Sequence, residues 1–149
     1  MEDLASVIRA HPFCAGLPDE HIALLVGCTR NLHFKRGELL MHEGEREDRL
    51  YLIRRGHVAL ESGAHGAETV YLETVGPGDV LGVSCITPHA AHLDCRATES
   101  VVALAVDNQC LTHKMQEDPR LGYLIAMRLL DLTYQRLARR RLQSLDIYK

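Results

Sequence analysis

The sequence predicts a mostly β protein, an antiparallel sandwich or jelly roll with flanking helices. Between residues 29 and 107, short apolar runs are separated by turns that contain glycine, which is typical of antiparallel sheets. Two runs, TVYLETV and HVALE, alternate apolar and polar residues as half-buried strands do. The segments on either side carry apolar residues at helical spacing. We therefore expect one domain over 1–149, with N-terminal helices over 1–28, a jelly roll over 29–107 and C-terminal helices over 108–149.

The N-terminal segment is expected to form two short helices. Leu4, Val7 and Ile8 make one apolar stripe, and Pro18 stands where it would open a second helical turn that carries Ile22. The β region that follows is divided by glycines at Gly37, Gly44, Gly56, Gly63, Gly66, Gly76, Gly78 and Gly82.

The C-terminal segment is expected to hold a long helix that joins two subunits. Asn108 is a candidate N-cap, and Pro119 stands near the first turn of the longer helix. From residue 121 to 132 nearly every face is apolar, so the helix must be buried on more than one side. A row at alternating four- and three-residue spacing is typical of a coiled-coil seam, and we interpret it as the seam of a homodimer. The row comprises Tyr123, Met127, Leu130, Tyr134 and Leu137. The alternative is a core helix of a monomer.

The composition describes a globular chain and excludes several classes of protein. With 149 residues, 46% hydrophobic and 25% charged, the chain can bury one core, since a domain takes roughly 100–200 residues. A net charge of −3 gives no global positive field that would draw the chain onto DNA. The apolar runs fall well short of the ~18 residues that a membrane span needs. Residues 1–25 have neither the basic start nor the apolar stretch of a secretory signal.

Five cysteines stand in the chain, an odd number without close spacing throughout. Without a secretory leader, this number favours free thiols in a reducing cytoplasm over a disulfide framework. We therefore expect a cytoplasmic protein in which Cys14, Cys28 and Cys110 fill the core.

Two segments carry a resemblance to a known family. They are FKRGELLMHEGEREDRLYLIRRGHVALES, residues 34–62, and GPGDVLG, residues 76–82. With their glycine spacing, the chain resembles the cyclic-nucleotide-binding-domain superfamily, which includes the catabolite activator and fumarate-nitrate regulator proteins, over roughly residues 12–145. The resemblance implies a jelly roll followed by a long dimerisation helix. It also implies a non-enzymatic sensory module that binds a small effector.

The phosphate-binding cassette departs from the pattern of that family. Gly82 is kept, but Val83 stands where the family has the Glu that holds the ribose, and Ala91 stands about where it has the Arg that neutralises the phosphate. Loss of such a charge-assisted pair costs about 2–5 kcal/mol, so we do not expect ordinary tight binding of cyclic AMP. The effector pocket is expected near residues 82–96, and the resemblance implies that hydroxyls on the long helix of the partner subunit close it. Its candidate residues are Gly82, Val83, Ser84, Cys85, His92, Arg96, Thr133 and Tyr134.

A second departure concerns DNA. The transcription regulators of the family follow the long helix with a helix-turn-helix domain, whereas this sequence ends at Lys149. We expect a stand-alone branch without direct DNA binding, the alternative being a fragment of a longer regulator. Four arginines at the helix end are expected on a solvated face, although they could touch an acidic partner. They are Arg136, Arg139, Arg140 and Arg141.

A group of thiols and imidazoles lies inside the altered cassette, at Cys85, His89, His92 and Cys95. Two thiols and two imidazoles suit a tetrahedral zinc or iron site, or one axial ligand of a haem. The other interpretation makes Cys95 a small buried strand residue and places the two histidines on a solvated loop.

Three hypotheses for the function follow. The leading one is a sensor that binds an effector in the jelly roll and transmits the binding through the dimer helix. The alternatives are a redox or gas sensor that uses a metal or haem at the cysteine–histidine group, and an interaction scaffold with a vestigial pocket that binds a partner protein. We expect no enzyme, because no catalytic motif is found and Asp79 and Asp94 form no recognisable acid–base pair.

Overall fold

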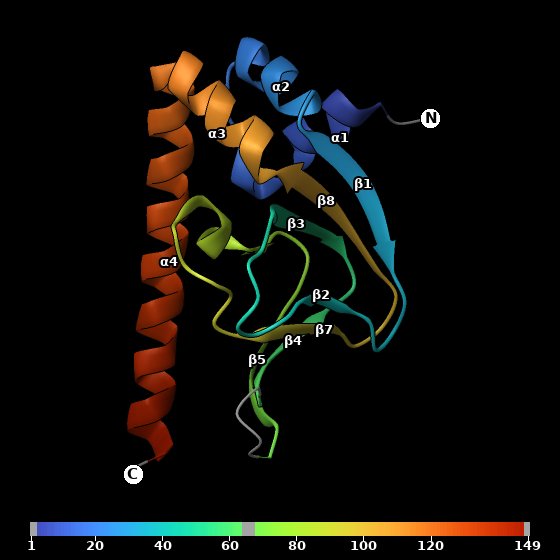
Figure 1. Cartoon of the computed structure of the whole chain (residues 1–149), viewed down its shortest axis with the longest axis vertical. Coiled ribbons are helices and arrows are strands. Elements are labelled where there is room, and N and C mark those ends of the chain that lie inside the picture. The colour runs from blue at the N-terminus through green and yellow to red at the C-terminus, as the bar shows by residue number, and fades with distance from the viewer. Residues whose placement is uncertain (1–2, 64–67, 148–149) are drawn as a thin grey trace.

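The computed structural model describes residues 3–63 and 68–147 of the chain, with side chains up to residue 142 (Figure 1). Within these residues it confirms the predicted fold class: two four-stranded antiparallel sheets with flanking helices and a long C-terminal helix. The first sheet has the order β1-β8-β3-β6 and the second β2-β7-β4-β5. The strands are β1 (Thr29–Phe34), β2 (Leu39–Met41), β3 (Arg49–Arg55), β4 (Val58–Ser62), β5 (Val70–Val75), β6 (Val80–Leu81), β7 (Asp94–Ala97) and β8 (Val101–Asp107).

The central strands of the first sheet, β3 and β8, are buried on both faces. Along β3, Leu50 and Leu52 pack in a cluster with the helices, whereas Tyr51 and Ile53 pack in a second cluster between the two sheets. Successive side chains of a strand point to opposite faces, so a continuous apolar run such as LYLI fits this position.

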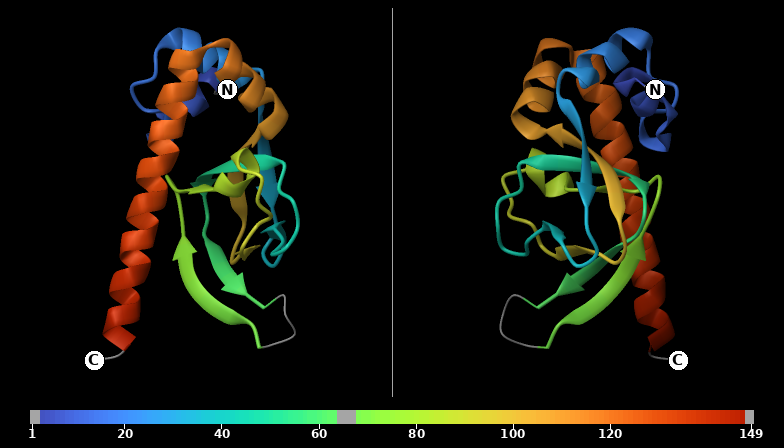
Figure 2. Two further views of the ribbon diagram at one scale, coloured as in Figure 1. Left: turned by 60° about the vertical axis from the view of Figure 1, so that its left-hand side comes forward. Right: turned by 90° about the vertical axis from the view of Figure 1, so that its right-hand side faces the viewer.

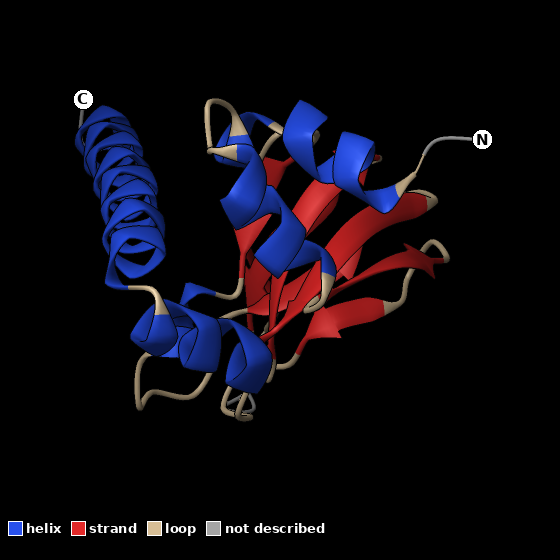
Figure 3. Cartoon of the chain, turned by 90° about the horizontal axis from the view of Figure 1, so that it is seen from above, coloured by secondary structure: helices blue, strands red, loops and turns tan. Residues whose placement is uncertain are grey.

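The helices cover one end of the sandwich, and the longest one runs down its side (Figures 1 and 3). They are α1 (Leu4–Ala10), the short 3-10 helices η1 (Pro12–Cys14) and η2 (Val83–Ile86), α2 (Asp19–Val26), α3 (Asn108–Glu117) and α4 (Pro119–Ile147). Pro119 is the first residue of α4, as predicted. The N-cap of α3 is Asp107 rather than Asn108, because the Asp107 carboxylate accepts a hydrogen bond from the Cys110 amide at 2.9 Å.

The start of α4 is fastened to α2 and α3. Asp118, which lies between α3 and α4, accepts a hydrogen bond from the Leu121 amide, and its other oxygen lies 3.3 Å from Nε2 of the buried His21. Leu121 and Ile125 are buried in the helical cluster. Beyond this anchored part α4 continues beside β5 and η2 (Figure 2). No described helix is long and apolar enough to cross a bilayer.

The structure corrects the expectation of free thiols for two of the five cysteines. Cys28, just before β1, and Cys110, in the first turn of α3, form a disulfide across a sequence separation of 82 residues. Antiparallel pairing of β1 with β8 sets Thr29 opposite Val106, and this register brings the two cysteines together. Cys14, Cys85 and Cys95 are free and buried. One basis for expecting a reducing compartment is thereby removed.

Candidate effector pocket

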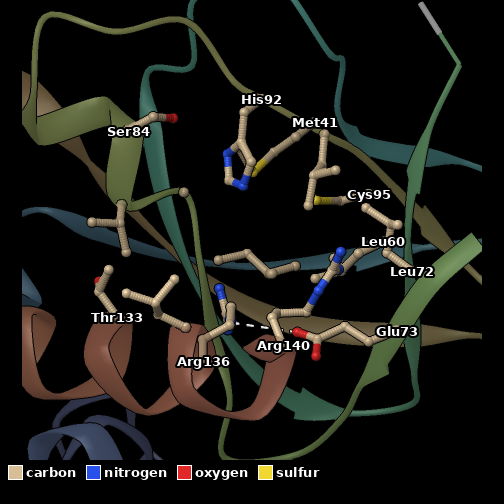
Figure 4. Close-up of a pocket in the computed structure, with 15 residues that line it drawn as sticks. Met41, Leu60, Leu72, Glu73, Ser84, His92, Cys95, Thr133, Arg136 and Arg140 are labelled. Atoms are coloured by element: carbon tan, nitrogen blue, oxygen red, sulfur yellow. Dashed lines mark ion pairs between the residues drawn. The ribbon is translucent and has the colours of Figure 1, made fainter. Parts of the chain in front are cut away.

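A cavity of about 370 Å3 lies between the jelly roll, η2 and the C-terminal half of α4 (Figure 4). We call it the α4 cavity. One of its walls comes from the predicted pocket segment 82–96 and the facing wall from α4. The lining residues are Met41, Leu60, Leu72, Glu73, Leu81, Gly82, Val83, Ser84, His92, Leu93, Cys95, Thr133, Arg136, Leu137 and Arg140.

Most of the predicted pocket residues line this cavity, and some do not. Gly82, Val83, Ser84, His92 and Thr133 belong to the lining. The remaining three, Cys85, Arg96 and Tyr134, lie outside it.

Each of the three outlying residues has another environment. Cys85 is turned into the helical core. Arg96 donates from Nη1 to the Gly37 carbonyl at 2.9 Å, and its Nε lies 3.3 Å from a Glu61 carboxylate oxygen. The Tyr134 side chain is on the outer face of α4 and is 67% exposed.

Gly82 turns the chain from β6 into η2 at the edge of the cavity. Its φ of +95° lies in the left-handed region, and a Cβ at this position would stand 2.4 Å from the Arg49 carbonyl oxygen. Only glycine accepts both conditions, so Gly82 sets the path on which Val83 and Ser84 reach the cavity.

Arg136 enters the α4 cavity, contrary to the prediction of a solvated face for it. Its side chain is only 20% exposed, and it donates from Nη2 to the Val80 carbonyl at 2.9 Å. Burial lowers the pKa of its guanidinium. The face it occupies could have been found from helical spacing, because Leu129, Leu132, Arg136 and Arg140 succeed one another at three or four residues.

Glu73 of β5 faces Arg136 and was not found by sequence reasoning. Its side chain is 9% exposed, and Oε1 lies 3.6 Å from Arg136 Nε. This distance makes an ion pair but no hydrogen bond, so both atoms are buried without a hydrogen-bond partner. The pairing of β4 with β5 shifts between Leu60 and Glu61 and skips Leu72. This irregularity lets the neighbours Leu72 and Glu73 both line the cavity.

The polar groups of the α4 cavity make its interior electropositive. Arg136 and Arg140 enter from α4, and Glu73 is the one acidic residue of the lining. Partial burial and the two guanidinium groups lower the pKa of His92, which is therefore neutral at pH 7. Ser84 Oγ is buried and has no hydrogen-bond partner among the described residues.

The structure does not bring Cys85, His89, His92 and Cys95 together as the predicted metal site would require. The described residues contain no group of three or more His, Cys, Asp or Glu side chains placed to hold a metal ion. Cys85 points into the helical cluster and Cys95 into the cluster between the sheets. Burial raises the pKa of each thiol to about 12, which opposes the thiolate that a metal requires. His89 is on an exposed loop.

The jelly roll and the cavity against its long helix define a class, that of regulatory ligand-binding domains. Residues 31–118 match the family model of the cyclic nucleotide-binding domain, and the chain belongs to this family. It is 28% identical over 108 residues to a CRP-like cAMP-activated global transcriptional regulator of Mycobacterium tuberculosis. This match covers 72% of the chain and 48% of the relative, so the chain spans about half the length of that protein.

Solved structures show the same fold. A cyclic nucleotide-binding domain from Methylobacillus flagellatus superposes with a TM-score of 0.80 at 22% identity, covering 89% of this chain and 75% of that one. The N-terminal domain of a Streptomyces coelicolor transcriptional regulator gives 0.68 at 26% identity, covering 96% and 95%. The Thermus thermophilus catabolite activator protein gives 0.72 at 24% identity, covering 92% and 62%.

Proposed function

We propose that the chain is a non-enzymatic regulatory module that binds a small effector in the α4 cavity and transmits its presence through α4 to a second copy of the chain. One observation carries the proposal: α4 forms a wall of the cavity and also presents an exposed apolar row. Leu137 belongs to both, since it lines the cavity and is 67% exposed. A cytoplasmic location and the absence of direct DNA binding stay predictions.

The exposed row supports the homodimer. Its five residues, the predicted seam, are exposed, and four of them lie outside the cavity lining, to which Leu137 also belongs. Apolar side chains exposed along a helix mark an interaction surface. Their exposed fractions are 65% for Tyr123, 45% for Met127, 62% for Leu130, 67% for Tyr134 and 67% for Leu137. Because the opposite face of α4 packs on the rest of the chain, the exposed row is free to pack against the same row of a second copy.

The effector would act by favouring one arrangement of the two α4 helices. A ligand shifts such an equilibrium only when it binds one arrangement better than the other. Thr133, Arg136 and Leu137 line the cavity within little more than one helical turn. A change in the position of α4 therefore alters the affinity of a ligand that contacts these residues.

Ordinary cyclic AMP is not the effector that we propose. Ala91, at the place of the phosphate-binding Arg, is 3% exposed, and its amide donates to the Glu45 carbonyl in a loop outside the lining. Val83, at the place of the ribose-binding Glu, offers an apolar side chain to the cavity. Neither residue supplies the contact that a cyclic nucleotide would require.

The substitution Leu130→Lys is expected to convert the dimer to a monomer, because it places a charge at the centre of the seam. The measurement is molar mass by light scattering during gel filtration at micromolar concentration. The control is Gln135→Lys, which adds the same charge at an exposed position of α4 away from the seam. A wild-type protein that is monomeric at micromolar concentration would contradict the proposed dimer.

The effector-binding part of the proposal is tested by native mass spectrometry of the purified protein. We expect one small molecule bound per chain. If none co-purifies, we expect at least one metabolite of a panel to raise the melting temperature of the protein. No bound molecule and no stabilising metabolite would overturn this part of the proposal.

A further inference from the structure

We propose that the α4 cavity takes an amphipathic organic anion whose acidic group is bound by Arg136 and Arg140 and whose apolar body lies against the leucines of the jelly roll. This inference rests on the proposed function, because it names the class of effector for the same cavity. It assigns recognition of the anion to the long helix, at two residues outside the cassette segment 82–96.

The charges of the cavity favour an anion. The two guanidinium groups stand four residues apart on one face of α4 and both point into the cavity (Figure 4). Glu73 offsets one of them. Arg140 forms no ion pair with any residue whose side chain the structure describes. Two cations and one carboxylate leave one positive charge, which a monoanion would balance.

The buried pair is incompletely bonded. Arg136 Nε and Glu73 Oε1 are 3.6 Å apart, and neither has a hydrogen-bond partner among the described residues. Glu73 is itself more than nine-tenths buried. A carboxylate or phosphate oxygen at hydrogen-bonding distance from Arg136 would satisfy the orphaned donor, which the present geometry does not. Glu73 thus occupies, imperfectly, the position of an anion and would compete with the ligand for Arg136.

The rest of the lining favours an apolar body over a sugar. Most of the wall surface is apolar, with contributions from Met41, Leu60, Leu72, Leu81, Leu93 and Leu137. Hydroxyl groups of a ribose buried against these residues would lose their hydrogen bonds to water without replacement. An alkyl chain would gain by leaving water at the same place.

The test is calorimetric titration of the full chain with four probes. Octanoate and octyl phosphate have the same apolar chain and differ in the acidic group, a carboxylate or a phosphate. The probe that binds more tightly identifies the preferred group. Octanamide has the same body without a charge and is expected to bind about ten- to a hundredfold more weakly than the better anion. Cyclic AMP is expected to bind more weakly than that anion as well. Equal binding of octanamide, or preference for cyclic AMP, would overturn the inference.

Two variants that each remove one charge should shift the affinity in opposite directions. Arg140→Gln is expected to weaken binding of the anion by about tenfold or more, since it removes one of two cations. Glu73→Gln is expected to strengthen it, since it removes the competing carboxylate. Arg139→Gln, an exposed neighbour that does not line the cavity, is the control and should change affinity less than about twofold. Glu73→Gln weakening the binding would contradict the competition.

Failure of this inference is distinguishable from failure of the proposed function. If neither octanoate nor octyl phosphate binds at millimolar concentration, the ligand class is wrong. The proposed function would then still stand on the dimer and on a molecule found by native mass spectrometry, and it falls only when those are missing too.

Discussion

Reduction of the Cys28–Cys110 disulfide is expected to lower the free energy of unfolding by about 4–5 kcal/mol. The bond closes a loop with a sequence separation of 82 residues, and cross-linking a loop of this size removes that much chain entropy from the unfolded state. It also ties the start of β1 to α3, which packs against the start of α4. The measurement is urea unfolding of the wild type with and without dithiothreitol, at one fixed protein concentration.

The variant Cys110→Ser serves as the control for the disulfide. It is expected to unfold near the midpoint of the reduced wild type and to be insensitive to dithiothreitol. Cys110 is partly exposed, so the serine hydroxyl keeps access to water and adds no buried polar group. A wild type whose urea midpoint is the same in both conditions would show that the bond does not stabilise the folded chain.

The fold could be predicted from the sequence because its signals are local. Glycines that require a positive φ, such as Gly37 and Gly56, mark corners of the jelly roll wherever they occur in the chain. The spacing of the row from Tyr123 to Leu137 likewise follows from one helix alone, and the structure places all five residues on an exposed face.

The charged part of the candidate site could not be predicted in this way because it depends on tertiary structure. Glu73 reaches the cavity through an irregularity in the pairing of β4 with β5, and strand alternation alone gives no sign of it. Arg136 lies 56 residues from Val80, the residue whose carbonyl it binds. The disulfide is similar, since nothing near Cys28 in the sequence indicates Cys110.

The substitution Arg136→Met is expected to destabilise the fold by about 3 kcal/mol. The methionine keeps much of the apolar stem but removes the charge, and Glu73 is then left as a buried carboxylate without a cation at 3.6 Å. Breaking a buried ion pair from one side leaves an uncompensated charge, which costs more than the pair contributes. The hydrogen bond to the Val80 carbonyl is lost as well. Urea unfolding at pH 7 measures the effect.

A double-mutant cycle separates this cause from lost packing. Arg136→Met combined with Glu73→Gln removes both charges, so the double variant is expected to recover most of the loss and to lie within about 1 kcal/mol of the wild type. Glu73→Gln alone should cost less than Arg136→Met, because the Arg136 side chain is 20% exposed and keeps its bond to Val80. Arg139→Met, at an exposed position, should change stability by less than about 0.5 kcal/mol. If the double variant is as unstable as the two single losses added together, the pair is not coupled, and Glu73 does not hold the place of an anion at Arg136.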